Sequence, residues 1–197
     1  DIAYFEDLHL SLRLNDASGD VATPVQTFDS NGDAYRLEQG FGTPNTPTDM
    51  LSGFECTETL DGTVVANSGR AAGSIALNGP AGSMAVVVDR FWQNYPKSFE
   101  TQFDTLSVGL WPAFGNGPLF CGQYCNPANS PEAVDPLCLE YYRLEGGRWK
   151  THTMVFDFKA TGAFTTAELQ DAANRINRPL MFTAQSNWNF KNFAFGS

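Results

Sequence analysis

Alternation of apolar and polar residues is the clearest pattern near the start of the chain. The segment LHLSLRL, residues 8–14, places leucine at every second position, with His9, Ser11 and Arg13 between the leucines. A period of two is typical of a β-strand with one buried face. The alternation returns in DTLSVGLW at residues 104–111. The pattern predicts a strand in both segments.

Glycine-punctuated apolar runs extend the strand pattern through the middle of the chain. TVVANSG, residues 63–69, predicts one strand, and residues 73–92 predict two strands joined by the turn NGPAG. Residues 138–158 predict two further strands around the turn EGG. Consecutive strands with short turns indicate an antiparallel meander.

The pattern changes to a helical period near the end of the chain. In TTAELQDAANRI, residues 165–176, apolar residues recur at spacings of three, four and seven, and Thr165 with Glu168 has the form of a capping box. The aromatic-rich remainder has no clear period, and we expect it to form an extended strap. The prediction is an all-β chain: an antiparallel β-sandwich over residues 1–178 with one short C-terminal helix, followed by the strap over residues 179–197. Barrel closure is the alternative.

Composition narrows the classes of partner. The chain has 197 residues, which suits one all-β domain, and 22 acidic against 12 basic residues give a net charge of -10. That charge disfavours nucleic acid, and an acidic glycan would need a local basic cluster. No apolar stretch reaches the roughly 20 residues of a membrane helix, so no membrane span is expected. The chain starts at Asp1 rather than Met, which we expect of a processed chain or a piece of a longer one.

The cysteines and one acidic turn are the candidates for cross-links and metal. Cys56, Cys121, Cys125 and Cys138 are an even number in an acidic chain, which favours disulfides and a secreted, extracellular protein. Pairing of Cys121 with Cys125, or of Cys125 with Cys138, is the preferred interpretation over a zinc site. No cofactor is expected.

DSNGD, residues 29–33, places Asp29, Asn31 and Asp33 at the first, third and fifth positions of a calcium loop. Ala34 and Gly40 stand where that loop needs glycine and a carboxylate. An ordinary turn is therefore favoured over a calcium site.

The segment RFWQNYPKSFE, residues 90–100, is the first candidate binding site. A period of two places Arg90 and Trp92 on the face of Val88, and Tyr95 and Lys97 follow within a proline-containing turn. One interpretation is that the aromatic residues close the edge of the core. The other is that a sugar ring stacks on an indole while its carboxylate contacts Arg90 or Lys97.

The segment GGRWKTHTMVFDF, residues 146–158, is the second candidate. Lys150 and His152 begin a face that continues through Met154 and Phe156. A histidine at such a place is commonly a core-edge residue, and the alternative is a general base or a contact for a carboxylate. His9 lies on the polar side of its strand, and we expect it to be exposed.

Four of these segments together resemble one known family. VVVDRFWQNYPKSFE, LSVGLWP, LEGGRWKTHTMVFDF and NRPLMFTAQSNW, with FAFG further on, occur in this order. In this they are similar to the central β-sandwich of the exo-rhamnogalacturonan lyase (YetA-like) proteins, polysaccharide lyase family 26. The likeness runs from about Gly73 to the C-terminus and is interrupted by the cysteine-rich segment. Family members carry an N-terminal β domain and a C-terminal α/α toroid, and the strap corresponds to the connection into the toroid.

The resemblance implies β-elimination at a uronic acid in a longer parent chain. A cation stabilises the carboxylate while a base removes the α-proton. Lys150, His152 and Tyr95 are the catalytic candidates, and Arg90, Trp92 and Lys97 are the candidates for binding an acidic polysaccharide or another glycan. Without a toroid the chain is expected to be incomplete as a catalyst and to serve as a scaffold or a sugar-binding domain. The alternative is a non-catalytic structural module that assembles into homo-oligomers outside the cell.

Overall fold

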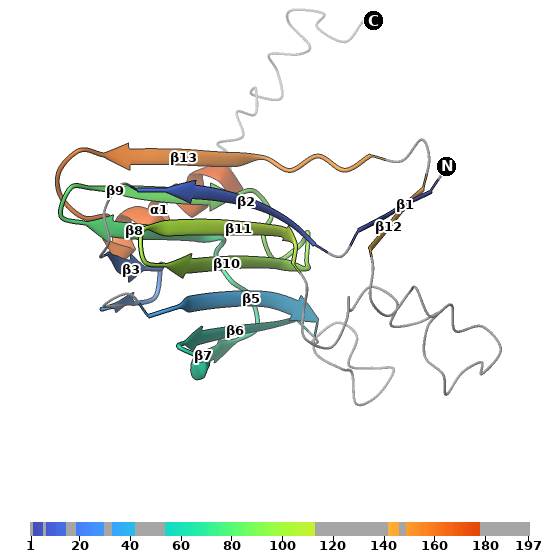
Figure 1. The fold of residues 1–197 in the computed structure, drawn as a ribbon, viewed down its shortest axis with the longest axis horizontal. Helices are drawn as coiled ribbons and strands as arrows, with labels where there is room; N and C mark the ends of the chain where they lie inside the picture. The colour runs from blue at the N-terminus through green and yellow to red at the C-terminus, as the bar shows by residue number, and fades with distance from the viewer. Residues whose placement is uncertain are drawn as a thin grey trace, which may run out of the picture.

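The computed structural model shows two large antiparallel β-sheets, a separate two-stranded antiparallel sheet and, among the described residues, one helix (Figure 1). It describes residues 2–5, 7–14, 19–29, 33–41, 54–112, 142–145 and 149–177. The two large sheets, of six and five strands, pack face to face, so the predicted antiparallel β-sandwich with a short C-terminal helix is confirmed. The predicted strap over residues 179–197 lies outside the described residues.

The larger sheet has six strands in the order β2-β11-β10-β5-β6-β7. Their bounds are β2 Leu8–Arg13, β5 Tyr35–Phe41, β6 Phe54–Leu60, β7 Thr63–Ser68, β10 Lys97–Gln102 and β11 Thr105–Trp111. The strands predicted from LHLSLRL and DTLSVGLW are β2 and β11, and they pair with each other. β2 lies at the edge of the sheet, so Leu8 and Leu10 stay largely exposed, whereas Leu12 packs against the core.

The second sheet has five strands in the order β13-β9-β8-β3-β4. Their bounds are β3 Asp20–Ala22, β4 Thr27–Phe28, β8 Ser74–Gly79, β9 Gly82–Val88 and β13 Met154–Lys159. The predicted hairpin around NGPAG is confirmed, because β8 pairs with β9. The hairpin predicted around EGG is wrong: β12, Tyr142–Glu145, pairs with β1, Ile2–Phe5, and β13 pairs with β9. Both predicted strands exist, but each has a distant partner.

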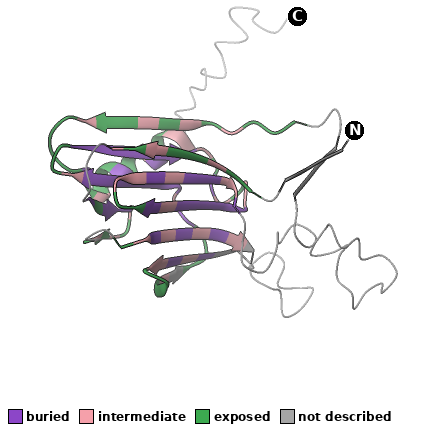
Figure 2. Cartoon of the chain, in the orientation of Figure 1, coloured by how far each residue is buried: buried purple, intermediate pink, exposed green. Residues whose placement is uncertain are grey.

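The core lies between the two large sheets, and the strands of both sheets carry many of the buried residues (Figure 2). Met84, Val86 and Val88 face the larger sheet, where they meet residues such as Phe99 and Leu106. Ala85 and Val87 are buried on the opposite face of β9, which carries α1. A strand that is apolar on both faces is therefore central, as its sequence predicts.

The helix α1, Thr166–Asn177, covers the outer face of the second sheet (Figure 1). Its capping box is confirmed: Thr165 Oγ1 accepts from the Glu168 amide at 3.2 Å, and the Glu168 carboxylate accepts from the Thr165 amide at 2.8 Å. Lys159 Nζ also donates to Glu168 at 2.7 Å. The hydrogen bonds that the carboxylate accepts, led by that from Lys159, lower the pKa of Glu168 to about 2.

The turn after β9 departs from the predicted period of two. β9 ends at Val88, and Arg90 has a left-handed backbone with φ of 50°. Phe91 is consequently the buried aromatic residue of RFW, and its ring stacks on Phe99 with centroids 4.5 Å apart. Arg90 and Trp92 therefore do not continue the inner face of β9, which corrects the expected geometry.

Cys56 has a free thiol that is buried in the core. It takes part in no disulfide in this structure, and burial raises the pKa of the thiol to about 12. The other disulfide candidates, Cys121, Cys125 and Cys138, lie outside the described residues, as does Asn31 of the calcium candidate.

Two of the three calcium-candidate residues lie in the described part of the chain. Asp29 and Asp33 are exposed there, and no three acidic, histidine or cysteine side chains gather in a metal-binding group among the described residues. Within the same residues no helix is long and apolar enough to span a membrane.

Candidate functional site

A group of basic and aromatic residues gathers at one end of the sandwich. β10 begins there, β11 ends there, and residues 149–153 lead into β13 (Figure 1). Asp89, after the end of β9, donates its amide to the Thr153 carbonyl at 2.9 Å, which extends the β9–β13 pairing toward this end. We call the group the basic cluster. It consists of Asn94, Lys97, Trp111, Lys150 and His152.

Lys97 is the buried cation of the basic cluster. Its residue is 1% exposed, and Nζ donates to the Leu110 carbonyl at 2.5 Å and to the Pro96 carbonyl at 3.0 Å. The ammonium also lies 5.5 Å from the centroid of the Trp111 ring, within cation–π range. Burial, followed by the positive charge of Lys150, lowers the pKa of Lys97 to about 7. Protonated and neutral Lys97 therefore coexist near neutral pH.

Lys150 is the exposed cation of the cluster. Its Nζ donates to Asn94 Oδ1 at 2.7 Å. This bond joins the segment before β13 to the turn between β9 and β10, two regions 56 positions apart in sequence. An amide oxygen orients the ammonium but carries no negative charge that would form an ion pair with it.

His152 contacts the Trp111 ring and is close enough to both lysines for their charges to act on it. Its imidazole meets Trp111 edge-on, with centroids 4.8 Å apart. Nδ1 and Nε2 are both buried and have no hydrogen-bond partner among the described residues. Burial, then the charges of Lys97 and Lys150, lower the pKa of His152 to about 4. The imidazole is therefore neutral at neutral pH, with one nitrogen able to accept a proton.

The cluster has an unbalanced charge. Neither Lys97 nor Lys150 forms an ion pair with a carboxylate in the described part of the chain, and no acidic residue is among the causes of the lowered pKa of Lys97 or His152. Like charges in a partly buried place repel one another and raise the free energy of the folded state. An anion placed against these groups would lower that free energy.

The structure brings together some of the predicted site residues and separates others. Lys97, Lys150 and His152 are close enough for their charges to affect one another. Arg90 instead points to solvent, with its side chain 70% exposed, and pairs with Asp89 at 3.7 Å. The ring of Trp92 is covered on one face by the guanidinium of Arg70 at 4.3 Å.

Tyr95 is half-buried, precedes Pro96 through a cis peptide bond and lies two positions before Lys97 in the sequence. The binding roles predicted for Arg90 and Trp92, and the catalytic role predicted for Tyr95, stay predictions.

Two members of the cluster were not among the predicted site residues. Trp111 ends a strand that was predicted correctly, yet nothing in the alternation of β11 indicates that its ring meets His152. Asn94 lies in a turn and differs from many other surface asparagines only through its contact with Lys150. Both contacts depend on the pairing of β9 with β13, which the sequence pattern did not predict.

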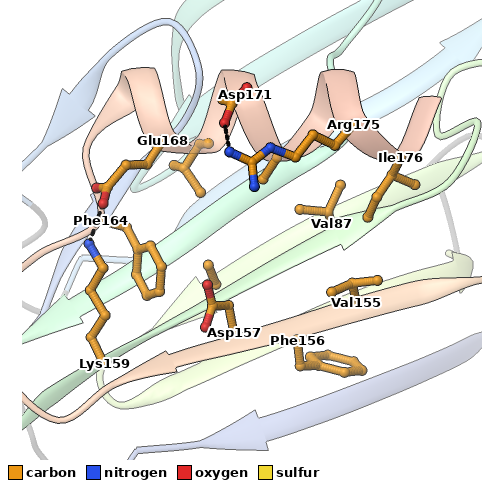
Figure 3. A pocket seen from close by; sticks show the side chains of 13 residues that line it. Val87, Val155, Phe156, Asp157, Lys159, Phe164, Glu168, Asp171, Arg175 and Ile176 are labelled. Atoms are coloured by element: carbon orange, nitrogen blue, oxygen red, sulfur yellow. Dashed lines mark hydrogen bonds and ion pairs between the residues drawn. The ribbon is translucent and has the colours of Figure 1, made fainter. Parts of the chain in front are cut away.

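A concave site lies elsewhere, between α1 and the outer face of β9 and β13, with a volume of about 560 Å³ (Figure 3). Its floor is apolar and includes Val87 and Val155. The cations at its rim are neutralised: Lys159 pairs with Glu168, and Arg175 pairs with Asp171. None of the predicted site residues lines this groove. The basic cluster is therefore the stronger candidate for recognition of an anion.

Comparison with known proteins adds no relative, since no family model, curated protein or solved structure matches this chain.

Proposed function

We propose that the protein binds an acidic glycan at the basic cluster and that the cluster recognises the carboxylate of a uronic acid. The observation that carries the proposal is the presence of Lys97, Lys150 and an unpartnered His152 with no neutralising carboxylate among the described residues. A carboxylate accepts charge-assisted hydrogen bonds from an ammonium. The exposed Lys150 makes that contact, and the buried Lys97 adds positive potential beneath it.

A sugar acid suits the surroundings of the two lysines better than a polyphosphate does. The indole of Trp111 is part of the cluster, and aromatic faces bind sugar rings through the apolar C–H side of the ring. The chain's net charge of -10 repels any polyanion at long range, whether a polyphosphate or an acidic glycan. This repulsion is screened beyond about 8 Å at physiological salt, so the local cluster dominates at contact. The resemblance to rhamnogalacturonan lyases, and with it the expectation of an extracellular protein, supports the same ligand class.

Cleavage by β-elimination is a second candidate function, favoured by the state of His152. In that reaction a base takes the proton beside the carboxylate, the electrons of that C–H bond form a carbon–carbon double bond, and the glycosidic C–O bond breaks as its oxygen takes a proton from water. The lowered pKa of His152 keeps its imidazole unprotonated at neutral pH, as a base requires, and the reaction would also require the substrate to reach one of the two buried ring nitrogens. Lys150 would stabilise the carboxylate as negative charge develops on it.

Calorimetric titration with oligogalacturonides tests the binding proposal. We expect the wild type to bind them and to ignore neutral oligosaccharides of the same length. Lys150→Met should weaken binding about 10- to 100-fold, as expected when a charged hydrogen bond is lost. Arg13→Met is the matched control, because Arg13 pairs with Asp104 in the turn that joins β10 to β11 at the opposite end of the sandwich. Equal affinity for the acidic and neutral sugars would refute the proposal. Absorbance of the new double bond reports elimination separately.

A further inference from the structure

The turn that carries Asn94 is tied to the C-terminal end of α1. The Arg90 amide donates to Asn177 Oδ1 at 2.7 Å, across 87 positions in sequence. Asn177 Nδ2 donates to the Ala173 carbonyl at 2.9 Å and approaches the Ala72 carbonyl at 3.5 Å. A single side chain therefore contacts its own helix, the segment before β8 and the turn after β9.

Arg90 needs support at this position. A non-glycine residue with φ of 50° lies in the left-handed region, which is unfavourable for a side chain with a β-carbon. The hydrogen bond from its amide to Asn177 offsets part of this cost, because a backbone amide without a partner would add a further penalty. The left-handed turn and the contact with α1 thus stabilise each other.

From Arg90 the contacts continue directly to the basic cluster. The Arg90 carbonyl accepts from the Asn94 amide at 2.8 Å, and Asn94 Oδ1 accepts from Lys150 Nζ at 2.7 Å. We propose that Asn177 is a positioning residue for the basic cluster: it holds the turn through the Arg90 amide and so fixes Asn94 where it orients Lys150. The effect on sugar affinity rests on the function proposed above, whereas the effect on the turn does not.

Asn177 also has the ordinary role of a helix cap, and its two side-chain atoms separate the two roles. Nδ2 caps α1 by donating to the Ala173 carbonyl. Oδ1 holds the turn by accepting from Arg90. Asn177→Asp keeps an acceptor for Arg90 but loses the donor for the cap, and it places a negative charge at the C-terminal end of the helix, which is unfavourable. Asn177→Ala loses both.

The test compares these two variants by titration with oligogalacturonides and by thermal unfolding. Both variants should have a lower Tm than the wild type. Asn177→Ala should bind about 2- to 10-fold more weakly, the usual effect of one lost hydrogen bond, whereas Asn177→Asp should bind nearly as well as the wild type. Equal affinity of Asn177→Ala and the wild type, or equal weakening by both variants, would overturn the proposal.

A measurement without sugar keeps this inference separate from the proposed function. The side-chain amide resonances of Asn94, followed by NMR, should shift in Asn177→Ala and stay close to their wild-type positions in Asn177→Asp. If the wild type binds no acidic sugar but the resonances behave in this way, the function is wrong and the positioning role holds. Unchanged resonances in Asn177→Ala would reject the positioning role whatever the sugar data show.

A rescue variant adds an independent check. Glycine adopts the left-handed region without cost, so Arg90→Gly should make the turn less dependent on Asn177. Asn177→Ala should therefore weaken sugar binding less when it is introduced into the Arg90→Gly variant than when it is introduced into the wild type. If Asn177→Ala weakens sugar binding equally in the Arg90→Gly variant and in the wild type, the role assigned to the turn is wrong.

Discussion

Replacing Lys97 with methionine tests the buried charge directly, because methionine keeps the apolar length of the side chain and removes the amine. The pKa of Lys97 is lowered from 10.5 to about 7 in the folded protein. Each pKa unit corresponds to about 1.4 kcal/mol, so the protonated form is disfavoured by on the order of 5 kcal/mol. The variant also leaves the Pro96 and Leu110 carbonyls without this donor, at about 1–3 kcal/mol for each buried group. These opposing effects make the net change in stability at a single pH a poor test.

The dependence of stability on pH is the sharper measure. Between pH 7 and 10.5 the unfolded chain keeps the Lys97 proton while the folded protein has lost it. The free energy of unfolding of the wild type should therefore rise with pH in this window, by about 1.4 kcal/mol per pH unit from this residue alone. Below pH 7 both states are protonated, and the contribution of Lys97 to the slope disappears.

Urea denaturation at several pH values from 6 to 9.5 measures this effect. The free energy of unfolding of Lys97→Met minus that of the wild type should be constant below pH 7 and should fall steadily above it. Arg13→Met, at an exposed position at the other end of the sandwich, should differ from the wild type by a constant amount throughout. Parallel curves for Lys97→Met and the wild type would mean that the amine is effectively solvated in the folded state, and the electrostatic reasoning would fail.

Three further changes test separate parts of the structure. Gly73→Ala should lower the free energy of unfolding, measured by urea denaturation, by at least ~2 kcal/mol. The reason is that Gly73 has φ of 83° and that a β-carbon there would lie 2.5 Å from the β-carbon of Phe91. An unchanged free energy of unfolding would contradict this close packing. Glu168→Gln should remove a contribution to stability that the wild type has above pH 4.5 and loses as the pH falls toward 2; thermal unfolding from pH 2 to 6 shows whether the two proteins converge at low pH. Lys150→Met should raise the pKa of His152, measured by NMR, because it removes one of the charges that lower it; an unchanged pKa would place Lys150 too far away to act.

Sequence patterns predict the elements of this fold better than they predict its pairings. The alternation in β2 and β11 and the capping box of Thr165 and Glu168 are local properties, and each appears in the structure as expected. The partner of β13 is not a local property. A short turn favoured a hairpin between β12 and β13, yet β13 pairs with β9 and β12 pairs with β1.

The candidate site shows the same division between local and long-range information. The residue types of Lys97, Lys150 and His152 indicated chemistry, and the structure places all three in one cluster. The burial of Lys97 and its contact with Trp111 could not be inferred, because they depend on how β10 and β11 meet the segment before β13. The left-handed backbone of Arg90 shifted the period of two by one residue. For that reason Phe91 rather than Trp92 entered the core.

The distribution of ion pairs separates the basic cluster from the other described basic residues. Several of those residues pair with a carboxylate: Arg13, Arg36, Arg90, Lys159 and Arg175. Acidic residues outnumber basic ones by 22 to 12 in the whole chain, yet no acidic side chain among the described residues pairs with Lys97 or Lys150. If the carboxylate of a ligand binds beside Lys97 and Lys150, a carboxylate introduced into the protein at that position should compete with the ligand.

Asn94→Asp supplies that carboxylate with almost no change in shape, because Asn94 Oδ1 already lies 2.7 Å from Lys150 Nζ. The new ion pair should keep or raise Tm by reducing the repulsion between the two lysines, and it should weaken the binding of oligogalacturonides about 10-fold or more, as expected for a charged hydrogen bond. Asn94→Ala is the matched control, since it removes the same contact without adding charge, and it should bind more tightly than Asn94→Asp. If Asn94→Asp binds as well as the wild type, the positive charge of the cluster is not what attracts an acidic ligand.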